Sequence, residues 1–262
     1  MSSQDDILVD VEAGGVAVIT INRPQKRNAL ALANWQQIGE ICLELGHRAD
    51  VRSVILTGAG GNFCAGADIS EFPTVRNTVE KGRFYEAIGE EATVRLRDLP
   101  KPTIAAISGY GVGGGTGIAL ACDFRIGDKS SRMGIPAARL GIVYGPLDCE
   151  LLLRQVGLSN AKLVLYSGRF FGIEDCKRMG LVDMADERPA LETARAFAAE
   201  LAANAPLSQK GAKVVLEALA AGEAEKRHKA IEAVIDEALA SEDYREAAIA
   251  FVAKKTPVFK GR

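Results

Sequence analysis

Hydrophobic positions in the first half of the chain follow two periodicities. Short runs rich in β-branched residues predict buried strands at 7–12, 16–21, 53–58, 103–107 and 124–126. Gly14 and Gly15 separate the first two runs and predict a hairpin turn. Apolar residues at helical spacing predict a helix over 31–48, and a more polar segment predicts another over 77–97. The first half therefore predicts an α/β body.

Beyond about residue 145 the pattern is helical alone. It predicts helices at 146–156, 159–167, 173–179, 189–204, 206–221, 226–240 and 242–253. Asn204-Ala205-Pro206 predicts a hinge before the last three. We therefore expect an α/β body over 1–204 and a helical C-terminal region over 205–262.

The composition excludes several classes of protein. Acidic and basic residues are interspersed and give a net charge of −2, so no basic stripe for nucleic acid is expected. No apolar run is long enough to span a membrane, and the amino terminus lacks a signal-peptide core. Five scattered cysteines favour reduced thiols in a cytoplasmic protein. His47 and His228 lie far apart in charged, helix-like contexts, so no metal site or histidine triad is expected.

The stretch GYGVGGGTGIALACD at 109–123 contains many glycines and no acid until its last residue. The glycines can simply allow a helix to pack closely on a sheet. They also match the G-x-G-x-x-G dinucleotide pattern, with Asp128 as the ribose ligand. That match is weak, because only about eight residues remain for a crossover helix that needs roughly ten or more.

A third interpretation is an oxyanion site. A strand that runs through glycines into a helix start leaves backbone N–H groups unpaired, and the helix dipole adds partial positive charge there. The segment GNFCAGADISEF at 61–72 predicts a second turn of this kind, again built from small residues. Two such turns leave room for a ligand between them, with one amide from each directed at the same oxygen.

Five blocks of the sequence resemble the crotonase family of enoyl-CoA hydratases and isomerases. In order along the chain they are INRPQKRNAL (21–30), FCAGADI (63–69), KPTIAAISGYGVGGGTGIALACD (101–123), SNAKLVLYSGRFFGIEDCKRMGLVD (159–183) and AFVAKKTPVFK (250–260). The resemblance covers nearly the whole chain. It implies an α/β spiral of ββα turns with two sheets, a helical C-terminal region and an acyl-CoA substrate without further cofactor. It also implies a homotrimer, or a hexamer made of two trimers.

The resemblance also implies roles for single residues. The amides of Ala67 and Gly114 would hold the thioester oxygen, and Ala65, Asp68 and Ile69 would border the adenine and pantetheine. Lys26, Arg27 and Ala29 would lie near the nucleotide phosphates, and Phe251 and Lys254 would close over a coenzyme A site, either their own or a neighbour's. Two simpler interpretations stay open: Asp68 as a helix N-cap, and Lys26 and Arg27 on a solvated loop.

The chain departs from the family's hydratases at the acid–base positions. Those enzymes carry two glutamates; the matching positions here are Gly117 and, in MGIPAARLG, Ala137. Neither residue can transfer a proton, so two-glutamate hydration is in doubt, and so is isomerisation by a single glutamate at the second position. The glycine run therefore predicts a site for a carbonyl oxygen that lacks the usual general base.

Tyr144 and Asp148 are the candidates to replace that base. Tyrosine near this place also occurs in family members that decarboxylate methylmalonyl-CoA, so decarboxylation or C–C cleavage is one alternative, and a non-catalytic acyl-CoA binder is another. Simpler roles exist for both residues: Tyr144 as an apolar ring of the pocket and Asp148 as a charge at a helix N-terminus. Tyr85 and Glu86, on the helix predicted over 77–97, are further candidates to reach the pocket.

Overall fold

The computed structural model describes residues 5–262, and its centre is a six-stranded sheet. The strands run in the order β1-β2-β3-β4-β6-β9. Their bounds are β1 Ile7–Glu12, β2 Val16–Ile21, β3 Ser53–Gly58, β4 Thr103–Ile107, β6 Phe124–Gly127 and β9 Met184–Ala185. β1 and β2 form the expected antiparallel hairpin, and all further pairs are parallel. Parallel neighbours require crossovers, which the intervening helices supply.

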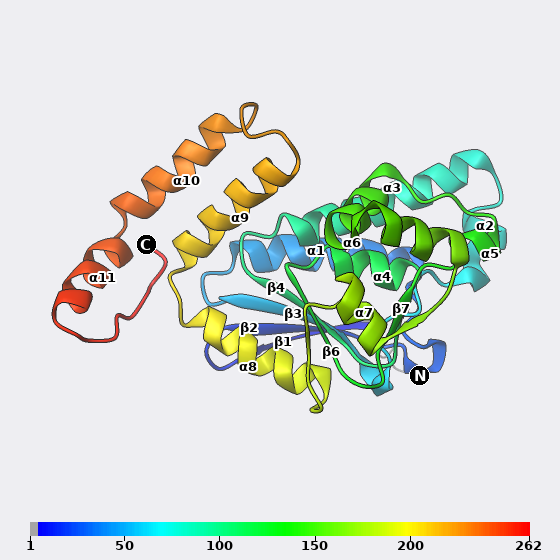
Figure 1. Cartoon of the computed structure of the whole chain (residues 1–262), viewed down its shortest axis with the longest axis horizontal. Helices are drawn as coiled ribbons and strands as arrows, with labels where there is room; N and C mark the ends of the chain where they lie inside the picture. Colours follow the sequence, from blue (N-terminus) through cyan, green and yellow to red (C-terminus); the bar gives the residue numbers. More distant parts are fainter. Residues whose placement is uncertain (1–4) are drawn as a thin grey trace.

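Both faces of this sheet are covered by helices (Figure 1). One face carries Val18, Ile55 and Ile104, which pack against small residues of α8 (Ala190–Ala202). The alternate residues of the same strands face α1 (Leu32–His47) and α4 (Gly114–Leu120). Because successive side chains of a strand point to opposite faces, a sheet covered on both sides reads as a continuous apolar run, as in SVILTG.

A second, three-stranded sheet lies beside the first and shapes the site. It consists of β5 Tyr110–Val112, β7 Arg132–Gly134 and β8 Phe171–Gly172. The helices around it are α2 Phe72–Val75, α3 Val79–Arg97, α5 Ala137–Leu140, α6 Pro146–Ser167 and α7 Ile173–Met179. Three short 3₁₀ turns complete this part: Pro24–Lys26, Ala59–Gly61 and Ile69–Glu71.

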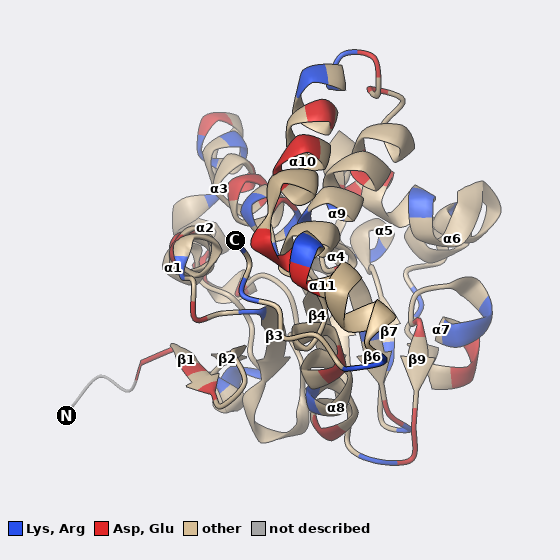
Figure 2. Ribbon diagram, turned by 90° about the vertical axis from the view of Figure 1, so that its left-hand side faces the viewer, with Lys and Arg blue, Asp and Glu red and all other residues tan. Residues whose placement is uncertain are grey.

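The last three helices project from one end of the body (Figure 1). They are α9 Pro206–Ala220, α10 His228–Ala240 and α11 Glu242–Val252. Lys213 fastens α9 to the body, because its ammonium lies 2.9 Å from the carboxylate of Asp123. On the face shown in Figure 2, both acidic and basic residues occur on these helices, and no block of basic residues is present there.

The predicted helices and strands are confirmed with small shifts in their ends. The sequence placed a break between 156 and 159, and α6 contains Gly157 in a non-helical conformation with φ 72°. Chain direction changes between Ala202 and Pro206, at the predicted hinge. The short strands β5, β7, β8 and β9 were not predicted. None of the helices in the described part is long and apolar enough to cross a membrane.

Candidate active site

Two strand-to-helix corners meet at one end of the body. The first corner follows Cys64, whose N–H donates to the Tyr110 carbonyl and whose carbonyl accepts from Val112. The second corner is the glycine run between β5 and α4, so the same bonds hold the two corners together. The predicted pairing of these segments is therefore present in the fold.

The amide of Ala67 points away from its neighbouring segment. The N–H of Leu30 donates to the carbonyl of Gly66, and the carbonyl of Leu30 accepts from the amide of Asp68. The segment around Leu30 therefore pairs with the residues before and after Ala67 but not with the Ala67 amide. In extended backbone the Ala67 N–H then faces the opposite side, and no acceptor for it occurs among the bonds of residues 5–262. Gly114 begins α4, so its N–H also lacks a partner one turn earlier.

Glycine at position 66 is what allows the corners to approach. Gly66 has φ +89°, and a Cβ there would stand 2.8 Å from the amide nitrogen of Gly114. A Cβ on Gly114 would stand 3.6 Å from the Cα of Gly66 and 3.1 Å from the Trp35 ring. Any side chain would separate the corners or displace the indole. The small residues thus let the corner that precedes Ala67 approach the unpaired amide of Gly114, the kind of close approach that an oxyanion site requires.

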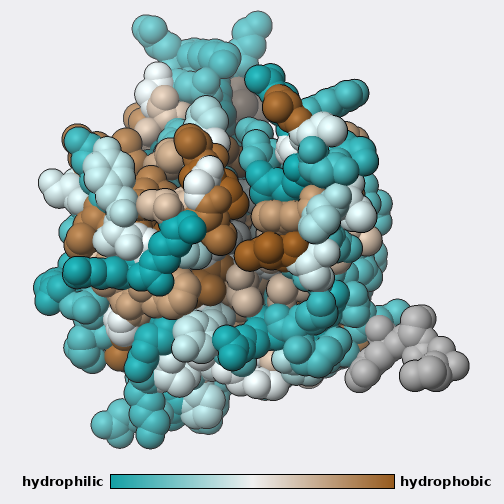
Figure 3. Space-filling model, turned by 90° about the vertical axis from the view of Figure 1, so that its right-hand side faces the viewer, coloured by the Kyte–Doolittle hydropathy of each residue, from teal (hydrophilic) through white to brown (hydrophobic). Residues whose placement is uncertain are grey.

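A cavity of about 280 Å³ opens in front of these amides. Ala65, Ala67, Ile69 and Gly114 line it, as predicted for an acyl-CoA site. Figure 3 shows that apolar residues gather around a hollow on this face. Exposed apolar side chains at its rim include Leu140 and Val143, the latter 87% exposed. Such an apolar, partly open cavity suits an acyl chain.

The resemblance matches the hydratases' two glutamates to Ala137 and Gly117, and of these two residues Ala137 lines the cavity. Ala137 begins α5 and lines the wall with a methyl group. Gly117 lies one turn along α4 from Gly114. A Cβ on Gly117 would meet one neighbour, the Oδ1 atom of Asp148, at 3.2 Å. The carboxylate of Asp148 therefore occupies the space beside Gly117.

Asp148 is partly buried in the first turn of α6. Burial, together with the nearby negative charges of Glu90 and Glu86, raises its pKa to about 6. The N-terminus of α6 supplies an opposing dipole, so the sequence-based role as a helix charge is also met. A carboxyl group that titrates near neutrality can both accept and donate a proton.

Tyr144 lies on the same wall. Its hydroxyl stands 3.6 Å from the point where a Cβ on Gly113 would be, next to the oxyanion corner. Burial raises the pKa of this phenol, and the charge of Asp148 adds to the effect. Tyr144 is therefore a neutral hydroxyl near the reacting region, and its ring also packs against the core.

Helix α3 forms the opposite wall. Tyr85 and Glu86 line the cavity, which confirms the expectation that they reach it. Glu90, one turn beyond Glu86, and Arg76, just after α2, also line it. Glu90 and Arg76 were not predicted from the sequence. The spacing of Tyr85, Glu86 and Glu90 along one helix face was the available signal.

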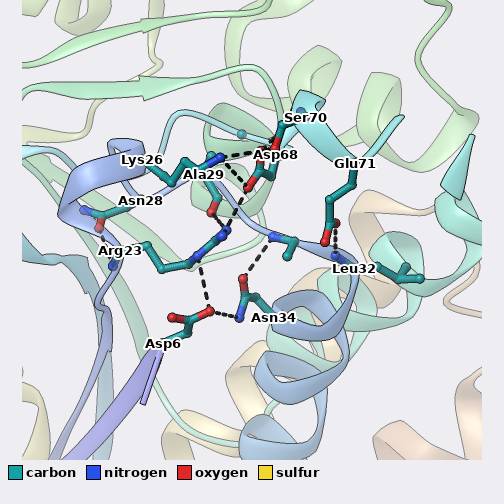
Figure 4. A network of polar contacts seen from close by, with 12 residues as sticks. Asp6, Arg23, Lys26, Asn28, Ala29, Leu32, Asn34, Asp68, Ser70 and Glu71 are labelled. Atoms are coloured by element: carbon teal, nitrogen blue, oxygen red, sulfur yellow. Dashed lines mark hydrogen bonds and ion pairs between the residues drawn. The ribbon is translucent and has the colours of Figure 1, made fainter. Parts of the chain in front are cut away.

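A polar network fixes the first corner from behind (Figure 4). Arg23 lies 3.1 Å from Asp68 and 3.2 Å from Asp6. Burial opposes ionisation of Asp68, but hydrogen bonds from Ser70 and Arg23 outweigh it and keep its pKa below the usual value. The Asp68 carboxylate accepts from the amide of Ser70, so the N-cap interpretation is confirmed.

Not every predicted site residue lies at the cavity. Asp68 is 5% exposed and turned into the network, and it is absent from the cavity wall. Lys26 reaches Asp68 at 3.6 Å and Ser70 at 3.2 Å, and the guanidinium of Arg27 lies over the ring of Tyr110. Ala29 is buried behind the same loop.

The C-terminal candidates lie elsewhere. Phe251 is on α11 and 86% exposed, and Lys254 follows that helix with a positive φ of 54°. In Figure 1, α11 stands at the opposite end of the molecule from α2 and α5. The chain therefore does not bring these two residues to its own cavity.

Asp128, the ribose ligand of the dinucleotide alternative, has a structural role. The Asp128 carboxylate accepts hydrogen bonds from Ser108, Ser130 and the amide of Ala190, so it serves the fold rather than a ribose. Both histidines are exposed. Among residues 5–262 no three His, Cys, Asp or Glu side chains are grouped as metal ligands.

Comparisons with known proteins agree with this geometry. The family model for enoyl-CoA hydratase/isomerase matches residues 11–262. A short-chain-enoyl-CoA hydratase from Clostridium acetobutylicum is 35% identical, over 98% of this chain and 99% of that protein. An enoyl-CoA hydratase/isomerase family protein from Hyphomonas neptunium superposes with a TM-score of 0.93 at 34% identity, covering 98% of both chains.

A second solved structure gives the same result. Enoyl-CoA hydratase from Bacillus anthracis superposes with a TM-score of 0.91 at 32% identity, over 98% of this chain and 100% of that one. The fold, the paired glycine-rich corners and a match along nearly the whole length support one conclusion. The chain belongs to the enoyl-CoA hydratase/isomerase family, whose enzymes process acyl-CoA thioesters.

Proposed function

We propose that the enzyme forms an acyl-CoA enolate between the amides of Ala67 and Gly114, and that Asp148 transfers the proton. The observation that carries this proposal is the position of Asp148. Its Oδ1 lies 3.2 Å from the Cβ point of Gly117, one helical turn from the Gly114 amide. An acyl group whose carbonyl oxygen sits at the amides would present its first carbons to this carboxylate.

The chemistry needs one proton acceptor at a time. The Asp148 carboxylate takes a proton from the α-carbon, and the C–H electron pair moves toward the carbonyl to give an enolate oxygen. The two amides stabilise that oxygen, at about 2.7–4 kcal/mol per donor in comparable sites. The protonated Asp148 then returns its proton to the γ-carbon of a 3-enoyl thioester, which yields the conjugated 2-enoyl thioester. Atoms and charge balance without a second acid.

Ala137 supports this assignment over hydration. Adding water across a double bond calls for a group that activates the water and a group that protonates carbon, and the methyl of Ala137 supplies neither. Isomerisation by a single carboxylate needs only Asp148, which lines the cavity. Tyr144 can hold the substrate or polarise it by hydrogen bonding, because its raised pKa keeps it neutral.

The test is turnover of 3-butenoyl-CoA to crotonyl-CoA, with α-hydrogen exchange in heavy water as a second readout. We expect Asp148→Asn to lose both by at least about 100-fold, within the range typical of a general base. Gly114→Pro should lose turnover as well, since proline removes the N–H of the first residue of α4, and its ring would also press on Trp35. Tyr144→Phe should cost less.

Other outcomes would redirect the assignment. Release of CO₂ from methylmalonyl-CoA that survives Asp148→Asn would favour decarboxylation at the same oxyanion site. Tight binding of many acyl-CoA compounds without exchange or turnover would contradict the proposal and favour a binder. Unchanged turnover in Gly114→Pro would remove the oxyanion assignment itself.

We further propose that Lys26, Arg27 and Ala29 meet the nucleotide end of coenzyme A outside the cavity, with the carboxylate of Asp68 positioning Lys26. Homotrimer or hexamer formation would bring Phe251 and Lys254 of one subunit to the site of another, in a cytoplasmic enzyme. The many exposed apolar side chains of the last helices, such as Leu216, Leu239 and Val252, support such an assembly. Light scattering of wild type and of a Leu216→Glu, Leu239→Glu double variant tests it; a monomeric wild type would contradict it.

A further inference from the structure

Four charged side chains line the acyl cavity, and three of them are acidic. Glu86 and Glu90 come from α3, Asp148 from α6, and the single base is Arg76. The remaining walls are apolar or carry neutral hydroxyl and indole groups, namely Tyr85, Tyr144, Thr93 and Trp35. The cavity therefore has an acidic side that the established family does not explain.

Arg76 is already engaged within the protein. One guanidinium nitrogen lies 2.6 Å from Glu86, and the group stacks over two rings, 4.7 Å from the centroid of Phe72 and 5.2 Å from that of Tyr85. Its side chain is 17% exposed. A ligand carboxylate would have to displace Glu86 to pair with Arg76.

Glu90 and Asp148 lack such compensation. Neither forms an ion pair with any residue in the described range 5–262. The negative charges of Glu90 and Glu86 repel the ionised form of Asp148 and thereby favour its protonated form. Any negative charge placed a few atoms beyond the reacting carbons would meet the same repulsion.

We propose that this acidic wall selects acyl groups without a negative charge, and that it rejects thioesters whose acyl chain ends in a carboxylate. The inference rests on the proposed function, which places the acyl carbons beside Asp148. It narrows the substrate class to neutral acyl-CoA compounds, either apolar or carrying hydroxyl or keto groups. It also argues against malonyl-type substrates, and hence against decarboxylation.

The experiment compares two ligands of equal size. 4-Oxopentanoyl-CoA and succinyl-CoA differ in a terminal methyl ketone against a carboxylate, so a difference in Kd by calorimetry reports the charge. We expect succinyl-CoA to bind roughly tenfold more weakly, the combined factor for two like charges that each lie about 12 Å away and cost about threefold at an effective dielectric constant of about 40. Equal affinity for both would overturn the inference.

Variants on α3 test the source of the discrimination. Glu90→Gln should reduce the ratio of the two Kd values to about threefold, because one of the charges is removed while the shape is kept. Glu86→Gln should nearly abolish it, because it also frees Arg76 to pair with the ligand. Glu80→Gln is the matched control: Glu80 is on the same helix but outside the cavity, and the ratio should not change.

A pH series tests whether the charge of Asp148 contributes to the difference in Kd. At pH 5 Asp148 is largely protonated while the succinyl carboxylate keeps most of its charge, so the ratio should shrink in wild type. An unchanged ratio at pH 5 together with an unchanged ratio in Glu90→Gln would overturn the acidic-wall explanation. If neither thioester binds at all, the proposed function fails, and that outcome is distinct from equal binding.

Discussion

The Oδ1 atom of Asp148 stands 3.2 Å from the point where a Cβ on Gly117 would lie. The two residues come from different helices, α4 and α6. Glycine at 117 is therefore what makes room for the carboxylate at 148. The chain thus brings an acid from α6 to the side of α4 that Gly117 leaves open.

Gly117→Glu should abolish turnover, because it places a second carboxylate against Asp148 with both steric and charge conflict. The double variant Gly117→Glu, Asp148→Gly should regain at least about tenfold over the single variant, since it restores one acid beside the cavity. Steady-state rates with 3-butenoyl-CoA give the comparison. A double variant no better than the single one would show that the two sites are not interchangeable.

The rate should depend on pH through Asp148. Its pKa of about 6 means that the proton-accepting form is lost as pH falls below that value. We expect kcat/KM for isomerisation to decline about tenfold per pH unit below pH 6 and to level off above pH 7. In Asp148→Glu the inflection should persist at a different pH, whereas a wild-type inflection above pH 8 would point to another base.

Asp148 should also cost stability at neutral pH. Its pKa is raised from 3.8 in the unfolded reference to about 6, so the native state holds the proton more tightly, and stability falls as pH rises through that window. Asp148→Asn should therefore raise the free energy of unfolding by about 1–2 kcal/mol at pH 8, less than the full shift because the group faces an open cavity. At pH 3.5 the two proteins should be equal; urea titrations at both pH values measure this.

Gly66→Ala should damage the oxyanion site through the backbone. The added Cβ would stand 2.8 Å from the Gly114 nitrogen, so the two corners must separate. We expect kcat to fall by about 100- to 1000-fold, the cost of losing one donor. Gly61→Ala is the control, since Gly61 has a similar φ of +80° but open space around it. Equal losses in both variants would indicate backbone strain alone.

The network behind the first corner should carry stability. Asp68→Ala leaves Arg23 and Lys26 without their shared carboxylate, and the Asp68 side chain is 7% exposed. We expect a loss of about 2–4 kcal/mol, as for a buried ion pair with one partner removed. Asp50→Ala, which breaks the exposed pair with Arg48, should change the unfolding free energy by about 0.5 kcal/mol or less. Thermal denaturation compares the two.

Local patterns in the sequence were sufficient for most elements. Proline at the start of α9 and the apolar stripe after it set that helix within one residue of the structure, at Pro206–Ala220. The strands β5, β7 and β8 were missed because each has two or three residues and is defined by partners distant in the chain. No local period exists in so short a segment.

The features of the site also fall into two groups: those that local sequence reveals and those that depend on how distant segments pack. The two glycine-rich corners could be found from composition, and Asp148 could be named as a candidate acid. That Asp148 faces Gly117 depends on how α4 and α6 pack, which no spacing along the chain encodes. The turn of Asp68 away from the cavity was likewise settled by Arg23, a partner 45 positions away.

Ala67 and Gly114 offer main-chain nitrogens, and replacing the side chains of Tyr144 or Asp148, on other segments of the chain, leaves those nitrogens where they are. The groups proposed to stabilise the oxyanion are thus backbone amides, whereas the groups proposed to transfer protons are side chains of other segments. In an enzyme arranged this way, single substitutions of the acid–base side chains can change the reaction while the backbone oxyanion site stays intact.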